Sequence, residues 1–155
     1  MELDKRDKQL LTLLQENGRA SLTELSRALN LSIDSTHKRL KKLKVSGIID
    51  RFGIFINPKV LGFDLVANVQ IKLHNISEKE LDDFTSYLKG HQNVVELITT
   101  LGDYDVTCVI IAKNTEELEE ISRKVRQKYR ELIADWKSVI NLKVHKFEHY
   151  SFDIK

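Results

Sequence analysis

The sequence is poor in cysteine, in proline and in long apolar runs, and these absences exclude several classes of protein. Its one cysteine, Cys108, forms no disulfide within the chain, which excludes a disulfide-stapled secreted domain. The cysteine and the five histidines lack the spacing of a zinc site, so no metal is expected. No stretch approaches 18 consecutive apolar residues, which argues against a membrane-spanning helix.

The first residues do not resemble a secretion signal. Residues 1–7 include three acidic and two basic side chains and have neither an apolar core nor a small-residue cleavage site. We therefore expect a cytoplasmic protein that has no membrane partner.

Positive charge is concentrated in the first part of the chain. Residues 1–60 contain 12 lysines and arginines against 7 aspartates and glutamates, a net charge of +5. Residues 61–155 contain 13 against 16, a net charge of −3. This division predicts that only the first part binds a polyanion such as DNA.

The first 30 residues have the pattern of two amphipathic helices. Leucines at spacings of three, four and seven predict a helix over residues 4–17, which Asn17-Gly18 ends. Ser21 and Glu24 have the spacing of a capping box that opens a second helix. The positions expected to be buried are Leu3, Leu10, Leu11, Leu13 and Leu14 in the first helix, and Leu22, Leu25, Ala28 and Leu29 in the second.

A third helix is expected to begin after Ser32 and to end before Gly47. Its inner side carries apolar side chains and a threonine, and its outer side carries hydroxyls first and cations further along. Such a helix fits the major groove of DNA, with its first residues at base edges and its cations at phosphates. The inner positions are Ile33, Thr36, Leu40 and Leu43, and the predicted DNA-binding residues are Ser32, Asp34, Ser35, His37, Lys38, Arg39, Lys41 and Lys42.

A solvated lysine-rich surface is the simpler interpretation of this third helix. Three consecutive helices, a short turn at Asn30 and the local positive excess favour a helix-turn-helix motif at about residues 23–42 instead.

Residues 48–56 are rich in β-branched and aromatic side chains, with Gly53 near the middle. This pattern predicts a small hairpin behind the third helix, as in a winged helix-turn-helix. Arg51 there is either a further DNA contact, to a phosphate, or an ordinary surface arginine. Asn57-Pro58 breaks the pattern. The expected division is a DNA-binding domain over residues 1–52, a hinge or linker strand over 53–63 and a second domain over 64–155.

From residue 65 the apolar period becomes alternating, which predicts a half-buried strand over residues 65–73. Ser77 and Glu80 form a capping box for a helix that Gly90 ends. Strands are predicted over 94–101 and 104–112, joined by a two-residue turn at Gly102-Asp103. Asn114 caps a second helix, whose inward residues are Leu118, Ile121, Val125, Tyr129 and Leu132, and a last strand alternates through Trp136, Ser138, Ile140, Leu142 and Val144.

This order, βαββαβ, predicts a ferredoxin-like domain and an α+β fold class for the chain. Both helices would cover one face of a four-stranded antiparallel sheet. The other face carries apolar side chains, so we expect a second copy of the chain to cover it as a homodimer. A symmetric dimer would present paired recognition helices to a pseudo-palindromic operator in double-stranded DNA. The apolar residues are Val66, Val95, Val109, Ile111 and Val139.

Several short segments occur in an order and spacing typical of one family. They are Leu3-Asp4 with Asp7, Asn17-Gly18-Arg19-Ala20-Ser21 with Glu24-Leu25, Leu31-Ser32 with Arg39-Leu40, Gly47-Ile48-Ile49, Asn57-Pro58 with Leu61-Gly62, and Gly102-Asp103-Tyr104-Asp105. Through these segments the chain resembles the Lrp/AsnC regulators of bacteria and archaea. The resemblance implies a prokaryotic, nucleoid-associated transcription regulator and dimers that assemble further into octamers.

The same resemblance implies an effector site between subunits near Gly102, commonly for an amino acid. Gly102 would let the ligand approach the backbone, and Asp103 or Asp105 would hold its ammonium group. Main-chain donors with Thr99 or Thr100 would take the carboxylate, and Tyr104 lies in the same turn. Judged from the residues alone, Gly102-Asp103 is equally an ordinary hairpin turn with Tyr104 as packing. No cofactor is expected beyond such an effector.

Two other functions compete with an effector-modulated, sequence-specific regulator. An architectural DNA-binding protein without an effector would share the fold and the basic surface. An enzyme is the second alternative, because some haem-pathway decarboxylases resemble this family and keep a decayed helix-turn-helix. The sequence has no nucleophile elbow or phosphate loop, and lysines at positions 38, 41, 42 and 44 indicate an intact DNA-binding surface. We therefore predict no catalytic residues.

Overall fold

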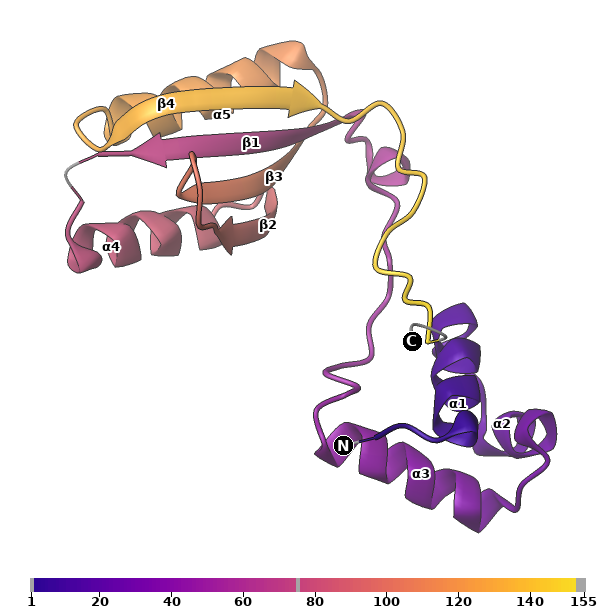
Figure 1. The fold of residues 1–155 in the computed structure, drawn as a ribbon. Helices are drawn as coiled ribbons and strands as arrows, with labels where there is room; N and C mark the ends of the chain where they lie inside the picture. Colours follow the sequence, from indigo (N-terminus) through magenta and orange to yellow (C-terminus); the bar gives the residue numbers. More distant parts are fainter. Residues whose placement is uncertain (1, 75, 153–155) are drawn as a thin grey trace. The chain divides into compact units, whose positions relative to one another are not determined.

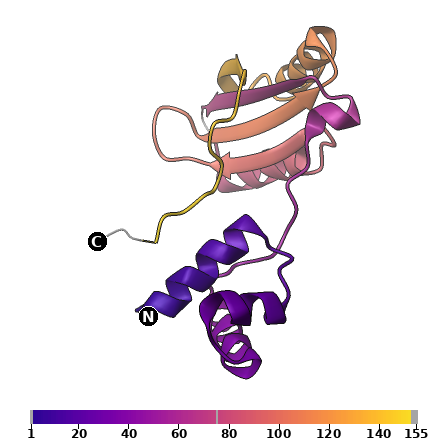
Figure 2. The same ribbon diagram turned by 90° about the vertical axis from the view of Figure 1, so that its right-hand side faces the viewer.

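The computed structural model describes residues 2–74 and 76–152, and its contacts divide the chain into two compact units. The first contains residues 2–55 together with 145–152 and is called the helical unit; the second contains residues 56–144 and is called the sheet unit. Figures 1 and 2 show the three helices of the first unit grouped together and the strands of the second side by side. The chain therefore passes between the units twice, after residue 55 and after residue 144.

Three helices form the body of the helical unit: α1 (Lys5–Glu16), α2 (Leu22–Leu29) and α3 (Ile33–Val45). Each begins after a side chain that accepts a backbone N–H of the first turn, which satisfies a donor with no partner inside the helix. These caps are Asp4, Ser21 and Ser32, so the predicted capping box at Ser21 and the cap at Ser32 are confirmed. The core consists of Leu10, Leu11, Leu25, Leu29 and Leu43.

Two positions expected in this core lie at the surface. Ala28 is exposed, and 51% of Ile33 is exposed. Ile33 is the first residue of α3, where no preceding turn of its own helix shields it. Thr36 takes the buried place on this side instead, because its hydroxyl donates to the Ser32 carbonyl at 3.0 Å.

The hairpin predicted over residues 48–56 is not formed, because these described residues contain no strand. Ile54 and Phe55 are each 80% exposed, and among the described residues no strand pairs with this segment. The expected linker strand is replaced by a short 3-10 helix, η1 (Pro58–Leu61). Asn57 caps this helix, Pro58 is its first residue, and Gly62 ends it at a φ of 85°. These local signals form a helix where a linker strand was predicted.

The C-terminal tail, residues 145–152, belongs to the helical unit, whereas the sequence placed it with the second domain. The side-chain amide of Gln15 pairs with the backbone of Tyr150 in both directions, donating at 3.0 Å and accepting at 2.8 Å. Phe152 packs against the leucine core, and the ring of Phe147 meets that of Phe55 edge to face at 5.6 Å. Residues of this tail therefore help to build the helical unit.

The sheet unit contains four antiparallel strands in the order β2-β3-β1-β4. Their bounds are β1 (Leu65–Leu73), β2 (Val94–Thr99), β3 (Val106–Ala112) and β4 (Ile133–Ile140). This is the predicted ferredoxin-like arrangement, and the alternation of β1 is confirmed, because Ala67, Val69 and Ile71 are fully buried.

Helices α4 (Glu78–Lys89) and α5 (Thr115–Lys128) pack against this buried side of the sheet (Figure 1). The capping box at Ser77 and the cap at Asn114 are both formed. Phe84 and Leu88 of α4 and Val125 of α5 are fully buried in the core. No helix in the described residues is long and apolar enough to cross a membrane.

The predicted boundaries of the later elements need correction. The strands β2 and β3 are joined by a six-residue loop, residues 100–105, and not by a two-residue turn. Helix α5 ends at Lys128, and β4 runs from Ile133 to Ile140. Leu142 is 92% exposed and lies two residues beyond the end of β4, whose last residue, Ile140, pairs with Ala67 of β1.

Cys108 provides a test of this core. It lies in β3 with no exposed surface, and burial raises the pKa of its thiol from 9.0 to about 12. Its thiolate fraction is then about a thousandfold below that of an ordinary cysteine, and reagent cannot reach the sulfur. We expect a thiol reagent at pH 8 to modify the native protein far more slowly than the same protein in guanidinium chloride. Equal rates would contradict the placement of β3.

Candidate nucleic-acid interface and effector loop

The start of α3 is built by hydroxyl groups. The Oγ of Ser32 accepts the backbone N–H of Ser35 at 3.1 Å and donates to the Oγ of Ser35 at 2.9 Å. Ser32 is exposed and Ser35 is half-buried at the surface. A helix start with exposed hydroxyls provides hydrogen-bonding groups of the kind that contact base edges and phosphates.

The outer side of α3 is polar and open to solvent. Asp34 and Lys38 form an ion pair one turn apart, at 2.8 Å, with more than 70% of each side chain exposed. His37 and Lys41 are also exposed, and within the described residues Lys41 forms no ion pair. A pair this exposed is weak, so Lys38 can exchange its carboxylate for another anion at little cost.

Arg39 and Lys42 are directed into the helical unit. Arg39 donates to Asp4 at 2.6 Å and to Asp7 at 2.7 Å, and Lys42 donates to the second oxygen of Asp7 at 3.1 Å. Asp7 is fully buried, whereas Arg39 and Lys42 keep 27% and 46% of their side chains exposed. These two cations therefore neutralise a buried carboxylate and fix α3 against the start of α1.

The charges of this cluster reinforce one another. The pKa of Asp4 lies below its usual value, first because its carboxylate accepts the Asp7 backbone N–H and second because it accepts from Arg39. The same hydrogen bonds, to Asp4 and then to Asp7, raise the pKa of Arg39. The lowered pKa of Asp4 and the raised pKa of Arg39 both favour the charged forms, so charge-assisted bonds join α3 to the start of α1.

Sequence reasoning missed the role of Asp7, although the sequence contained a signal for it. Asp7 lies four residues after Leu3 and three before Leu10, within the leucine stripe of α1. A carboxylate on a buried stripe requires cationic partners. The local pattern does not identify those partners, because Arg39 and Lys42 follow 32 and 35 residues later.

Two further cations lie at the end of α3 and after it. Arg51 is 86% exposed and faces only Asp50, at 3.9 Å, so it is available to a phosphate but is not positioned for one. Lys44, which was not among the predicted contacts, lies over the ring of Phe52 at 5.8 Å. This cation–π contact connects the end of α3 to the extended segment that follows it.

Three of the predicted effector residues are hydrogen-bonded within the sheet unit. The Thr100 hydroxyl donates to the Tyr104 carbonyl at 2.6 Å. Asp105 accepts the backbone N–H of Leu73 at 2.7 Å, which ties the loop to the end of β1. The Tyr104 hydroxyl donates to Asp135 of β4 at 3.0 Å, and this bond raises the pKa of Tyr104. These groups shape the loop.

The tip of the loop is open. Leu101, Gly102 and Asp103 are exposed, as is Thr99 at the end of β2. Gly102 has a φ of 155°, which side-chain-bearing residues rarely adopt, and nothing lies within 4 Å of where its Cβ would be. In the described part of the chain, Asp103 has no hydrogen-bonded or ion-paired partner. The loop thus presents one carboxylate beside accessible backbone.

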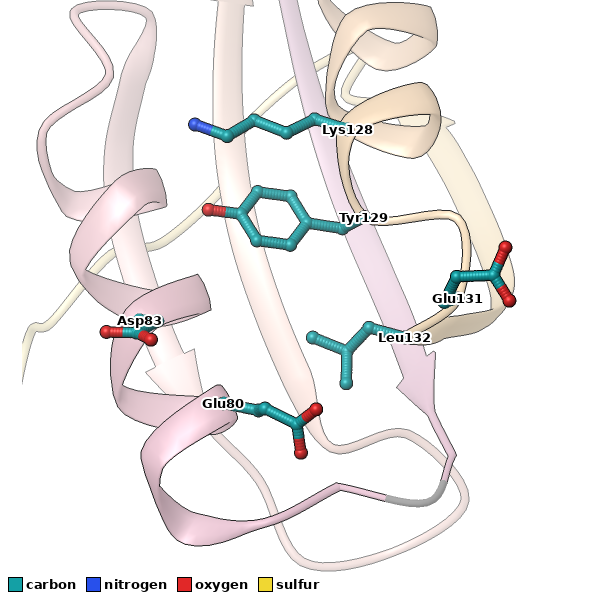
Figure 3. Close-up of a pocket in the computed structure, with 6 residues that line it drawn as sticks. All are labelled: Glu80, Asp83, Lys128, Tyr129, Glu131 and Leu132. Carbon is teal, nitrogen blue, oxygen red and sulfur yellow. The ribbon is translucent and has the colours of Figure 1, made fainter.

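A hollow of about 260 Å³ lies between α4 and the end of α5. Figure 3 shows Lys128, Tyr129 and Leu132 reaching toward α4, and Glu80 reaching back toward them. Its main polar groups are already bound: Glu80 accepts from Ser77, and the Lys128 ammonium lies 3.8 Å from the centre of the Tyr87 ring. The hollow joins two helices and is not the predicted effector site. No metal-binding group of side chains exists in residues 2–74 and 76–152.

The two units together define a class of protein. A three-helix unit with an outward-facing polar third helix, joined to a ferredoxin-like unit with an exposed loop, is the architecture of a two-domain DNA-binding regulator. A family model for winged helix-turn-helix DNA-binding matches residues 3–50, and the model of the Lrp/AsnC ligand binding domain matches residues 66–149.

Known proteins resemble the chain over most of its length. The HTH-type transcriptional regulator FL11 of Pyrococcus furiosus is 34% identical over 144 residues, which cover 93% of this chain and 92% of that protein. The structure of Escherichia coli AsnC matches with a TM-score of 0.81 at 25% identity, over 97% of this chain and 99% of that one. A Neisseria meningitidis regulator in complex with L-Met has a TM-score of 0.83 at 23% identity, over 99% and 97%.

The chain belongs to the Lrp/AsnC family of transcription regulators. It is a DNA-binding regulator with a ligand-binding domain, and the family consists of regulators and not of enzymes.

Asp7 supplies the test of how α3 is held. Replacing Asp7 with asparagine removes the charge that pairs Arg39 and Lys42, and charge-assisted bonds of this kind contribute about 2–3 kcal/mol. We expect Asp7→Asn to speed hydrogen exchange throughout α1–α3 and to leave the sheet unit unchanged. The matched control is Asp34→Asn, which removes an exposed pair and should cost about 0.3–0.5 kcal/mol. Equal effects of the two substitutions would contradict the role of Asp7.

Proposed function

We propose that this protein is a sequence-specific regulator whose DNA binding or assembly is modulated by an amino acid bound at the loop of residues 100–105. The observation that carries the proposal is that each unit has one exposed polar surface, while its neighbouring polar groups are bonded within the fold. In the helical unit this surface is the outer side of α3, and in the sheet unit it is the tip of the loop.

The DNA-binding surface consists of Ser32, Ser35, His37, Lys38 and Lys41, with Asp34 releasing Lys38. Hydroxyls at the start of α3 suit base edges, and Lys41, one turn further along, suits a phosphate. Arg39 and Lys42 act from inside, because their bonds to Asp7 fix the angle of the helix. Arg51 adds a phosphate contact beyond α3.

The effector is proposed to bind with its ammonium group at Asp103 and its carboxylate at main-chain donors beside Gly102. An exposed carboxylate next to open backbone provides complementary charges for the two ends of an amino acid. The relative solved with L-Met supports a ligand of this size. Thr99, Thr100, Tyr104 and Asp105 support the site through the loop conformation.

The protein is proposed to act as a homodimer that assembles further, up to an octamer. The side of the sheet away from α4 and α5 carries Ile98 and Val139, of which 47% and 50% are exposed, and Val66 and Val109, which are half-buried. A second sheet would cover these side chains and pair two recognition helices for a pseudo-palindromic operator.

Lysine substitutions on α3 test the DNA surface. We expect Lys41→Ala to weaken binding to operator and random DNA equally, and to lower the slope of log K against log salt by about 0.9, the loss of one phosphate contact. Lys38→Ala should weaken operator binding more than random binding. Binding is measured by fluorescence anisotropy at several salt concentrations. The control Lys79→Ala, in the sheet unit, should change neither; unchanged binding in both α3 variants would remove α3 from the interface.

The loop is tested by calorimetric titration with the common amino acids. We expect one of them to bind, and Asp103→Asn to weaken it about tenfold to a hundredfold, because a charge-assisted bond to the ammonium group is lost. Asp82→Asn, an exposed carboxylate on α4, is the control and should leave binding unchanged. A wild-type protein that binds DNA but gives no heat with any amino acid would indicate an architectural protein instead.

A further inference from the structure

Helix α5 has strongly divided charge. Its first two turns carry glutamates, whereas the stretch from Arg123 to Arg130 carries five cations and no acidic residue. All five are exposed although they belong to the acidic part of the chain. The glutamates are Glu116, Glu117, Glu119 and Glu120, and the cations are Arg123, Lys124, Arg126, Lys128 and Arg130.

The five cations fall into two groups. Lys124 pairs with Glu120 at 2.7 Å, and Lys128 lies over the Tyr87 ring, so both are engaged within the fold. The other three are arginines at positions i, i+3 and i+7, and with Gln127 they line a hollow of about 520 Å³. We call these three, Arg123, Arg126 and Arg130, the arginine stripe.

The arginine stripe has little negative charge to balance it. Arg123 donates to the neutral Gln127 amide at 3.1 Å, and Arg126 donates weakly to the Ser122 carbonyl at 3.4 Å. Within the described residues neither forms an ion pair, and Arg130 contacts only the exposed carboxylate of its neighbour Glu131. Three guanidinium groups on one hollow repel one another, and an anion bound there would relieve the repulsion.

We propose that the arginine stripe binds the phosphate backbone of double-stranded DNA, as a second contact separate from α3. The proposal rests on the DNA-binding function of the chain. Arg123 and Arg126 lie one turn apart on α5, about 4.5 Å along its axis, and Arg130 follows two residues after the helix ends at Lys128. Side chains spread over this length can reach two or three successive phosphates of one strand. Guanidinium forks match phosphate oxygens in pairs, which fits arginine better than lysine to this task.

Two features favour a nucleic-acid backbone over other anions. Among residues 115–130 no large apolar side chain is exposed, so the stripe offers no anchor to a protein partner or to a second copy of the chain. All residues that line the hollow come from α5 and its C-terminal end, so it has a single wall. Sites for small phosphorylated molecules bury most of the ligand and need further walls.

The test compares duplex lengths with the full-length protein. A duplex of about 20 base pairs holds two half-sites one helical turn apart, and one of about 100 base pairs adds flanking backbone. The variant is Arg123→Gln with Arg126→Gln and Arg130→Gln. Its charge-matched control is Lys79→Gln with Lys89→Gln and Lys113→Gln, which are exposed elsewhere in the sheet unit. The single variant Arg126→Glu provides a second measure, and circular dichroism confirms that each variant is folded.

We expect the stripe variant to bind the short duplex like the wild type and the long duplex about tenfold or more weakly. Its salt slope on the long duplex should fall by up to about 2.7, at about 0.9 for each lost phosphate. Arg126→Glu should act in the same direction, and the lysine control should match the wild type.

Three outcomes would overturn the proposal. The first is unchanged binding of the long duplex by the stripe variant. The second is an equal loss in the stripe variant and the lysine control, which would reflect net charge alone. The third is loss of calorimetric binding of inorganic pyrophosphate with DNA binding intact, which would assign the stripe to a small phosphorylated ligand. Failure of the wild type to bind even the short duplex would instead contradict the DNA-binding function itself.

Discussion

The buried carboxylate of Asp7 is the constraint on which the helical unit depends. Removing a charge from water costs several kcal/mol unless partners replace the lost hydration, and here Arg39 and Lys42 replace it. These bonds tie the start of α1 to the middle of α3. They also direct two cations of α3 toward Asp7, although Arg39 and Lys42 stay partly exposed. The outward face of the recognition helix therefore depends on Lys38 and Lys41, because Arg39 and Lys42 are bonded to Asp7.

The loop of the sheet unit also contains one carboxylate that is bonded within the fold and one that is not. Asp105 accepts the backbone N–H of Leu73, and Tyr104 donates to Asp135, so the loop is attached to β1 and β4. Asp103 lies two residues away and has no such partner in the described chain. Neighbouring carboxylates thus take different roles because only one of them meets a backbone donor. A rigid loop that carries one free charge suits a ligand better than a mobile loop would.

Local signals in the sequence predicted most of the fold. Ser21 with Glu24, Ser77 with Glu80, and Asn114 each cap a helix because the capping oxygen and the backbone N–H that donates to it lie within one turn. The alternation of residues 65–73 predicted β1 exactly, since one face of that strand is fully buried. The prediction of a hairpin at 48–56 was wrong, because residues that favour a strand do not form one unless a second strand pairs with them.

The candidate sites were less predictable than the fold. Periodicity placed Lys42 on the outer face of α3 and Arg39 on its flank, but the direction of each side chain depends on which residue lies opposite. Here that is Asp7, more than 30 residues earlier. In the same way, the sequence does not distinguish Asp103 from Asp105. They differ in the structure because the backbone N–H of Leu73 donates to Asp105.

The C-terminal tail makes the helical unit a discontinuous domain, with the sheet unit inserted between its two pieces. During synthesis, α1, α2 and α3 emerge before residues 56–144, and Tyr150 and Phe152 reach them only after those residues have been made. The sheet unit is by then fully translated and acts as the loop that closes between the two pieces. A chain released early by the ribosome would carry the entire helix-turn-helix without its last packing residues. The helical unit therefore completes its packing only after the sheet unit has been translated.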